Sequence, residues 1–281
     1  MDVEALAAVV VKQVDQPSEQ GRAHFWFHED LRLFLSRADG PELIYHYQGS
    51  PSIKDAVEAC GVPHVEVGLI LVDGRPTPFN GRLNGHGSRV QVFPPNDHPP
   101  VDETLLPPPR PPGRPVFVLD VHLGVLARFL RMLGFDSIYE ARDLGDARLA
   151  RIAGERAGIM LSRDIGLLKR GIVRHGYFLR SRDSREQLRE VVSHFGISWS
   201  ECRPFSRCLH CNDLLAPVAA EQVADRLPES VRGQYDEFHL CGSCDRIYWK
   251  GTHYLSMREI LDDLYLDQGE TVDEQEPPCP T

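Results

Sequence analysis

Two closely spaced cysteine pairs constrain this 281-residue chain more than any other feature. Each pair has the spacing Cys-x-x-Cys, and 29 residues separate the two pairs. Two such pairs can complete a tetrahedral shell around one metal ion, with metal–sulfur bonds of about 2.3 Å. A shell closed by four cysteines leaves no open position for a substrate, so the metal is structural. We therefore expect one structural zinc ion, bound by Cys208, Cys211, Cys241 and Cys244.

The alternative to a zinc site is redox chemistry. A thioredoxin-type motif comes as a single Cys-x-x-Cys pair, so the presence of two pairs favours zinc. His210 and His239 lie beside the pairs and are the alternative metal ligands. The other cysteines, Cys60, Cys202 and Cys279, stand apart, and we expect no disulfide framework in a cytoplasmic chain.

The hydropathy pattern indicates a cytoplasmic protein with no membrane partner. No run of about 18 apolar residues is present, as a transmembrane helix would need. The chain starts Met-Asp-Val-Glu-Ala, with acidic side chains where a secretory signal carries basic ones, and no cleavage pattern follows.

The charge distribution bears on nucleic-acid binding. The formal net charge is -10, yet residues 110–182 contain 14 Lys and Arg against 7 Asp and Glu, between acidic flanks. Salt screens charges over about 10 Å, so a basic middle can attract phosphates even in an acidic chain. The alternative is that these arginines form a solvated helix face.

The N-terminal part has the pattern of a small α+β roll over residues 22–94, after a loosely held leader at 1–21. Strand, strand, helix, strand and strand are expected at residues 24–28, 31–35, 52–59, 65–72 and 89–93. Ser52 is the expected N-cap of the helix, and Asp73-Gly74 is a good hairpin turn. Residues 95–115 are rich in proline and read as an extended linker.

Strands and helices alternate after the linker, over residues 116–200. Strands are expected at 116–119, 137–140, 159–162 and 176–179, and helices at 123–133, 147–157, 164–169 and 185–195. This alternation predicts an α/β fold in which helices flank a parallel sheet. A zinc ribbon with a closing helix (201–265) and an acidic tail (266–281) complete the predicted organisation.

Acidic residues follow the predicted strands of this parallel sheet. Asp120, Asp164 and Asp183 come after three of the strands, and Asp143 and Asp146 lie in the loop that leads into the second helix. Ligands bind outside the carboxyl ends of the strands in open parallel sheets. Carboxylates gathered there suit Mg²⁺ or Mn²⁺, and two such ions can promote phosphodiester hydrolysis. Helix capping is the alternative role of each aspartate.

Arginines near these acids are candidate phosphate ligands. Arg128, Arg142 and Arg163 are the three that we expect to hold a phosphate backbone beside the acidic site.

Three motifs in the middle of the chain resemble a known family. Phe117-Val-Leu-Asp-Val-His-Leu-Gly, Leu126-Ala-Arg-Phe-Leu-Arg-Met-Leu-Gly-Phe-Asp and Leu161-Ser-Arg-Asp are similar to the Mut-seven C-terminal RNase domain family, a branch of the PIN-like nucleases. The resemblance runs from about residue 116 to 260 and includes the cysteine pairs. It implies a PIN-like fold with Asp120, Asp146 and Asp164 at the metal-binding positions. Asp143 competes for the middle position, and Asp183 is a possible fourth ligand.

The segment 24–93 resembles the ubiquitin-like domain that often precedes this family and is related to sulfur carriers. Sulfur carriers end in Gly-Gly, whereas here the roll runs into Pro94-Pro95, so we expect a binding or packing module whose partner the sequence does not identify. The resemblance implies a metal-dependent ribonuclease, with tRNA and the ribosome as candidate partners. The alternative is a non-catalytic RNA- or ribosome-binding protein that uses the zinc ribbon and the basic face.

Overall fold

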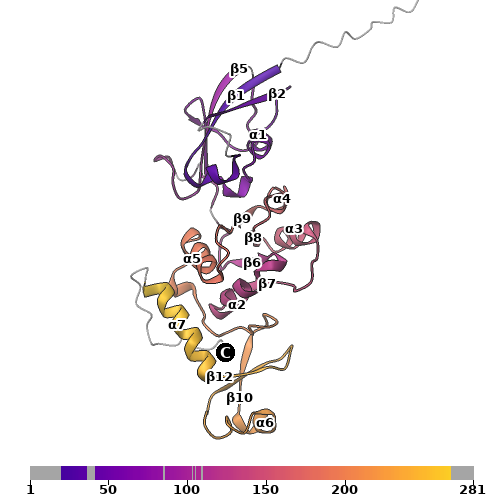
Figure 1. Cartoon of the computed structure of the whole chain (residues 1–281), viewed down its shortest axis with the longest axis vertical. Coiled ribbons are helices and arrows are strands. Elements are labelled where there is room, and N and C mark those ends of the chain that lie inside the picture. The colour runs from indigo at the N-terminus through magenta and orange to yellow at the C-terminus, as the bar shows by residue number, and fades with distance from the viewer. Residues whose placement is uncertain are drawn as a thin grey trace, which may run out of the picture.

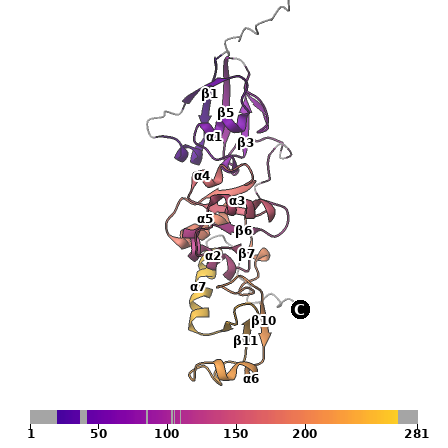
Figure 2. The ribbon, with the colours of Figure 1, turned by 90° about the vertical axis from the view of Figure 1, so that its right-hand side faces the viewer.

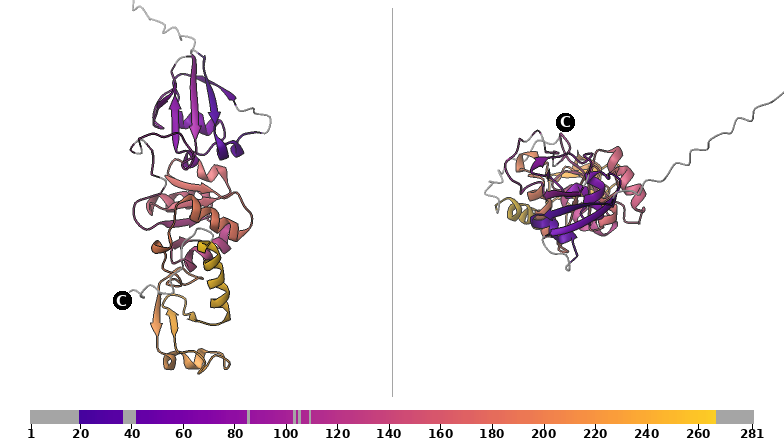
Figure 3. Two further views of the ribbon diagram at one scale, coloured as in Figure 1. Left: turned by 90° about the vertical axis from the view of Figure 1, so that its left-hand side faces the viewer. Right: turned by 90° about the horizontal axis from the view of Figure 1, so that it is seen from above.

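Three parts of the chain follow one another along the long axis of the molecule (Figures 1 and 2). The computed structural model describes residues 20–36, 42–84, 86–102, 104, 106–108 and 110–266. An N-terminal sheet lies at one end, a parallel sheet with its helices in the middle, and a small antiparallel sheet at the other end. The left view of Figure 3 shows the same succession from the side opposite to that of Figure 2. Most of the predicted leader and acidic tail, with Cys279, lies outside the described residues.

The N-terminal part is a five-stranded mixed sheet that packs on one helix. The strand order is β2-β1-β5-β3-β4, with β1 and β5 parallel and the other neighbours antiparallel. The elements are β1 (Gln20–Phe27), β2 (Glu42–Gln48), α1 (Ile53–Ala59), β3 (Leu69–Val72), β4 (Arg75–Pro76) and β5 (His86–Phe93). The predicted α+β roll is confirmed, and β1 begins inside the segment predicted as a leader.

Local sequence signals account for the helix and the hairpin of this roll. The Ser52 side chain accepts a hydrogen bond from the Asp55 N–H, as an N-cap does. Asp73 and Gly74 have φ values of 51° and 78°, the left-handed pair that a tight hairpin turn requires. Both predictions are confirmed.

The predicted second strand is wrong. Residues 31–35 lie mostly in a 3-10 helix, η1 (Glu29–Phe34), and the second strand is β2. The alternation of leucines with polar residues misled the prediction, because Leu31 is buried but Leu33 is 62% exposed. In β2 the odd-numbered residues from Leu43 to Tyr47 are the less exposed ones, which is the period of a half-buried strand.

The central part is a four-stranded parallel sheet in the order β7-β6-β8-β9. Its elements are β6 (Val116–Leu119), η4 (Val121–Leu123), α2 (Gly124–Met132), β7 (Asp136–Ile138), α3 (Asp146–Glu155), β8 (Ile159–Ser162), α4 (Ile165–Leu168), β9 (His175–Phe178) and α5 (Ser184–His194). The predicted α/β fold, with helices flanking a parallel sheet, is confirmed.

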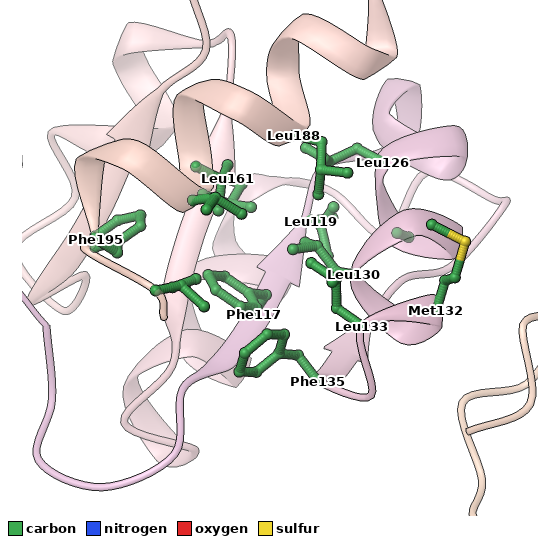
Figure 4. Close-up of a cluster of buried hydrophobic side chains, with 14 of the residues drawn as sticks. Phe117, Leu119, Leu126, Leu130, Met132, Leu133, Phe135, Leu161, Leu188 and Phe195 are labelled. Carbon is green, nitrogen blue, oxygen red and sulfur yellow. The ribbon is translucent and has the colours of Figure 1, made fainter. Parts of the chain in front are cut away.

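The strand order fixes where a ligand can approach this sheet. The chain moves from β6 to β7 on one side and then back past β6 to β8, so right-handed crossovers place α2 and α3 on opposite faces. Phe117 and Leu119 of β6 pack in the cluster that α2 and α5 cover (Figure 4). Val118 points to the other face of the sheet and packs under α3. The reversal between β6 and β8 is the switch point at which open α/β sheets bind ligands.

The C-terminal part is a three-stranded antiparallel sheet in the order β10-β11-β12, followed by a long helix. Its elements are η5 (Trp199–Glu201), β10 (Leu215–Val218), α6 (Ala220–Val223), η6 (Ala224–Arg226), β11 (Phe238–Cys241), β12 (Ile247–Trp249) and α7 (Thr252–Leu266). Helix α7 runs back along the central part (Figure 1), where Leu261, Leu264 and Tyr265 join its main core. No helix of the described segments is long and apolar enough to cross a membrane.

The N-terminal roll docks on the last strand of the parallel sheet through buried polar contacts. The short 3-10 helix η2 (His64–Glu66) lies against β9. His64 Nε2 lies 2.8 Å from the Val173 carbonyl oxygen, and the Lys169 ammonium donates to the Glu58 carbonyl at 2.6 Å. Strand β9 is the edge of the parallel sheet, so the roll covers an edge that would otherwise be open to another chain.

Candidate functional site

Two of the predicted acids meet at the switch point of the parallel sheet. Asp120 directly follows β6, and Asp164 follows β8 by two residues. Ser162, the last residue of β8, connects them, because its hydroxyl donates to Asp120 Oδ2 at 3.0 Å and accepts from the Asp164 N–H at 2.9 Å. The Ser162 side chain is fully buried, while Asp120 is half-buried and Asp164 exposed. One buried hydroxyl therefore links the Asp120 carboxylate to the backbone of Asp164.

Helix capping uses part of each carboxylate. Asp120 Oδ1 accepts from the Val121 N–H at 2.6 Å, at the start of η4. Asp164 Oδ1 accepts from the N–H groups of Gly166 and Leu167, at 2.6 and 3.2 Å, and caps α4. The capping interactions proposed as the alternative role are thus present, and they orient both side chains.

Asp183 repeats the local structure of Asp164 at the next strand. The tripeptide Ser-Arg-Asp occurs at residues 162–164 after β8 and at 181–183 after β9. In the second copy the Ser181 hydroxyl accepts from the Asp183 N–H at 3.0 Å, and Asp183 Oδ1 caps α5. The repeated tripeptide is the sequence signal for this similarity, because it gives the chain the same turn beyond the carboxyl ends of two adjacent strands.

Asp146 and Asp143 occupy the loop after β7. Asp146 is the first residue of α3, and its Oδ2 lies 3.7 Å from Arg170 Nη2. Asp143 is exposed and accepts from the Gly145 N–H at 2.8 Å. Among the described residues, no group of three acids is placed so that it could hold one metal ion. The structure links Asp120 and Asp164 through Ser162, and the other predicted acids do not share this link.

The three predicted phosphate-binding arginines have different surroundings. Arg163 Nη1 donates to the carbonyls of residues 179, 180 and 181, at 3.0, 2.7 and 2.5 Å. Arg163 therefore ties the end of β8 to the chain that leaves β9, and its guanidinium points into the protein. Arg128, on α2, and Arg142, in the loop before α3, are both exposed.

The four predicted zinc ligands converge at the start of the C-terminal part. Their sulfur atoms all lie within 4.8 Å of one another, and they are the one potential metal-binding group found in the described ranges. The Sγ atoms of Cys208 and Cys244 are 3.5 Å apart, and those of Cys211 and Cys241 are 3.3 Å apart. Sulfurs at about 2.3 Å around a tetrahedral zinc ion are about 3.8 Å apart. The four cysteines could therefore hold one zinc ion with small adjustments.

The shortest sulfur contacts join cysteines of different pairs, so both pairs belong to one cluster. This arrangement disfavours the redox alternative, in which a single Cys-x-x-Cys pair acts alone. His210 and His239 do not belong to the group.

The thiols of Cys208 and Cys211 differ in pKa. Burial raises the pKa of Cys208, but the Cys211 N–H and the Tyr248 hydroxyl, at 3.5 and 3.1 Å from its sulfur, lower this pKa to about 6. Burial and the neighbouring thiols raise the pKa of Cys211 to about 12. A set of crowded thiols of this kind becomes fully ionised when a cation binds.

Each cysteine pair ends in a residue with left-handed backbone conformation. Asn212 follows the first pair with φ 75°, and Asp245 follows the second with φ 59°. Asn and Asp are the side chains that best tolerate this region. Gly242, inside the second pair, has no positive φ, so the special backbone conformation lies at Asp245.

The first cysteine pair is fastened to the parallel sheet. The Arg131 side chain, which is 3% exposed, donates to the Leu209 and His210 carbonyls at 3.2 and 2.8 Å and also to the Ser137 carbonyl. Asn212 Oδ1 accepts from the Ser137 N–H at 3.0 Å. The conformation of the cysteine pair is therefore coupled to α2 and β7, which lie in the central part.

Comparison with known families accounts for this combination of parts. Residues 115–261 match the family model described as the Mut7-C RNAse domain, and that match covers more than half of the chain. The chain belongs to the Mut7-C RNAse domain family. Residues 21–99 match the model described as Mut7-C ubiquitin, so both predicted resemblances are confirmed. Searches of curated proteins and of solved structures returned no match.

The Mut7-C RNAse domain match begins one residue before β6 and ends inside α7. It therefore includes the parallel sheet, the Asp120–Asp164 pair and the four cysteines in one unit. The buried contacts of Arg131 and the return of α7 to the central core explain why these parts form a unit rather than two independent domains.

Proposed function

We propose that this member of the Mut7-C RNAse domain family is a metal-dependent ribonuclease with its centre at Asp120 and Asp164. The observation that carries the proposal is the Asp120–Ser162–Asp164 connection at the switch point of the parallel sheet. The Ser162 hydroxyl holds the Asp120 carboxylate and the Asp164 backbone at this edge, and two carboxylates at such an edge are a natural site for a hard cation.

The donor set suits Mg²⁺ or Mn²⁺. Mg²⁺ is commonly bound by one or two carboxylates, with water and substrate phosphates as the remaining ligands. Asp120 and Asp164 would therefore be enough to bind such a cation, and Asp146 is a further acid on the α3 side. Such a cation, when bound, activates water and stabilises the leaving oxygen, with 5′-phosphate and 3′-hydroxyl products expected.

The residues of the chain would contribute position and charge. Ser162 would fix the direction of the Asp120 carboxylate, and the α4 cap would fix that of Asp164. Arg163 would hold the end of β9 beside them, so that Asp183 lies at the same edge of the sheet. In this proposal Arg163 is a positioning residue and not a phosphate ligand.

Cleavage of a panel of labelled RNAs by the zinc-loaded protein tests this proposal. With added Mn²⁺ we expect cutting that Asp120→Asn and Asp164→Asn each reduce at least a hundredfold, whereas Asp73→Asn in the distant N-terminal hairpin leaves it unchanged. RNA binding without Mn²⁺-dependent cutting would favour the alternative of a non-catalytic RNA-binding protein. Comparison of tRNA, ribosomal RNA and unstructured RNA in the same panel would identify the substrate class.

A further inference from the structure

An open hollow beside Asp146 carries an excess of positive charge. Its volume is about 680 Å³, and its walls include Asp146 and the three arginines Arg148, Arg151 and Arg170. Arg148 and Arg151 are three residues apart on α3, so their side chains lie on the same side of the helix. Arg170 reaches the hollow from the loop after α4, which packs beside α3. The four charged side chains carry a formal charge of +2.

The arginine side chains of this hollow make no strong ion pair or hydrogen bond with the described part of the protein. Arg170 Nη2 is 3.7 Å from Asp146 Oδ2, and both side chains are more than 40% exposed, which indicates a loose pair. Arg148 and Arg151 are exposed, and within the described part of the chain their guanidinium groups make no hydrogen bond or ion pair. They differ in this respect from Arg163, whose guanidinium is held by three carbonyls. The hollow therefore offers free guanidinium groups to a ligand.

The hollow lies at the same edge of the parallel sheet as the proposed catalytic pair. Arg170 lies two residues beyond the last residue of α4, the helix that Asp164 caps. Asp146 begins α3 after β7, and β7 neighbours β6, the strand that Asp120 follows. Asp146 connects the two regions, because it lines the hollow and is the acid on the α3 side of the site.

We propose that Arg148, Arg151 and Arg170 bind backbone phosphates of the RNA strand whose phosphodiester is cut at Asp120 and Asp164. Guanidinium groups match phosphate oxygens in a bidentate geometry, and an open hollow admits a chain rather than enclosing a small molecule. The identification of the polyanion as RNA rests on the function proposed above. This arrangement explains how a chain of net charge -10 can hold RNA: the positive field is local to α3 and α4.

Salt-dependent RNA binding tests the inference independently of cleavage. The zinc-loaded protein carries Asp120→Asn, no Mn²⁺ is added, and the probe is a short fluorescent oligouridylate titrated at several KCl concentrations. We expect the double substitution Arg148→Gln/Arg151→Gln to weaken binding at least tenfold. The slope of log Kd against log salt should also fall by about 1.4, since each phosphate contact on a single strand contributes about 0.7.

Arg156→Gln is the matched control, because Arg156 is an exposed arginine at the end of the same helix and does not line the hollow. It should leave both the affinity and the slope close to those of the parent. Equal effects of the double substitution and the control, or no binding by the parent, would overturn the inference. If the slope changes as expected but the native protein cuts no RNA, the binding site stands and the proposed nuclease function fails.

Discussion

Glu66 in the N-terminal roll and Arg180 just beyond β9 form a 3.0 Å ion pair between two parts of the chain. The Glu66 side chain is almost fully buried, and its second oxygen accepts from the Phe178 N–H at 2.5 Å. Burial raises the pKa of Glu66, and the Arg180 guanidinium opposes this rise. The roll thus supplies the hydrogen-bond acceptor for a backbone N–H group of the parallel sheet. It is therefore packed against the sheet and not loosely tethered to it.

Removing this carboxylate should destabilise the whole protein. Glu66→Ala leaves the Phe178 N–H without its acceptor and Arg180 without its buried partner, so we expect a loss of about 3 kcal/mol in the free energy of unfolding. Urea denaturation measures this loss. Asp30→Asn is the control, because Asp30 pairs with the same arginine at 3.3 Å but is 65% exposed, and should cost less than about 1 kcal/mol. Similar losses for the two variants would contradict the structural role of Glu66.

Replacement of Ser162 should affect both stability and metal binding. Ser162→Ala removes the donor to Asp120 and the acceptor of the Asp164 N–H, so we expect a loss of about 1–2 kcal/mol in unfolding free energy and weaker Mn²⁺ binding. Calorimetric titration with Mn²⁺ measures the second effect. Ser181→Ala in the second Ser-Arg-Asp copy loses the equivalent bond to Asp183 but no bond to Asp120. If it weakens Mn²⁺ binding equally, the special role of Ser162 is refuted.

Substitution of one cysteine of the cluster should remove the zinc. We expect the purified protein to contain one zinc ion per chain, and Cys241→Ser, which replaces a fully buried ligand, to lose it and melt earlier by ten degrees or more. Elemental analysis and thermal unfolding measure these changes. Cys60→Ser changes a cysteine of the N-terminal roll and should keep the zinc. Full zinc content in Cys241→Ser would disprove the four-cysteine site.

Acid should destabilise the fold partly through His194. Burial, with a smaller effect of the Arg180 charge, lowers the pKa of His194 to about 4, whereas an unfolded histidine titrates near 6.5. The unfolded state therefore binds the proton first, and this one residue removes about 3 kcal/mol of stability as the pH falls from 6.5 to 4. Unfolding free energies measured across this range should depend less on pH in His194→Gln. A variant whose curve stays parallel to that of the parent would exclude this role.

Local features of the sequence determined most of the elements and the cysteine cluster. The spacing of Cys208, Cys211, Cys241 and Cys244 was sufficient to predict their cluster, because a four-cysteine shell depends on few residues at short range. The alternation of apolar strands with amphipathic helices was sufficient to predict the parallel sheet, because the spacing of apolar residues shows which face of each element is buried. The Ser52 cap and the Asp73-Gly74 turn followed from backbone preferences alone.

Tertiary structure decided which of these residues meet. Strand order placed β6 beside β8, and this neighbourhood joined Asp120 to Asp164 through Ser162, while Asp146 remained on the α3 side. Arg163 points toward the carbonyls that follow β9 because of packing between segments up to 18 residues apart in the sequence. The spacing of apolar residues along the chain does not predict such packing. The dependence of the sheet edge on Glu66, over a hundred residues away from Phe178, was likewise set by long-range contacts. Such contacts form between surfaces that only the folded chain brings together, so the sequence determined the parts of the site and the fold determined their arrangement.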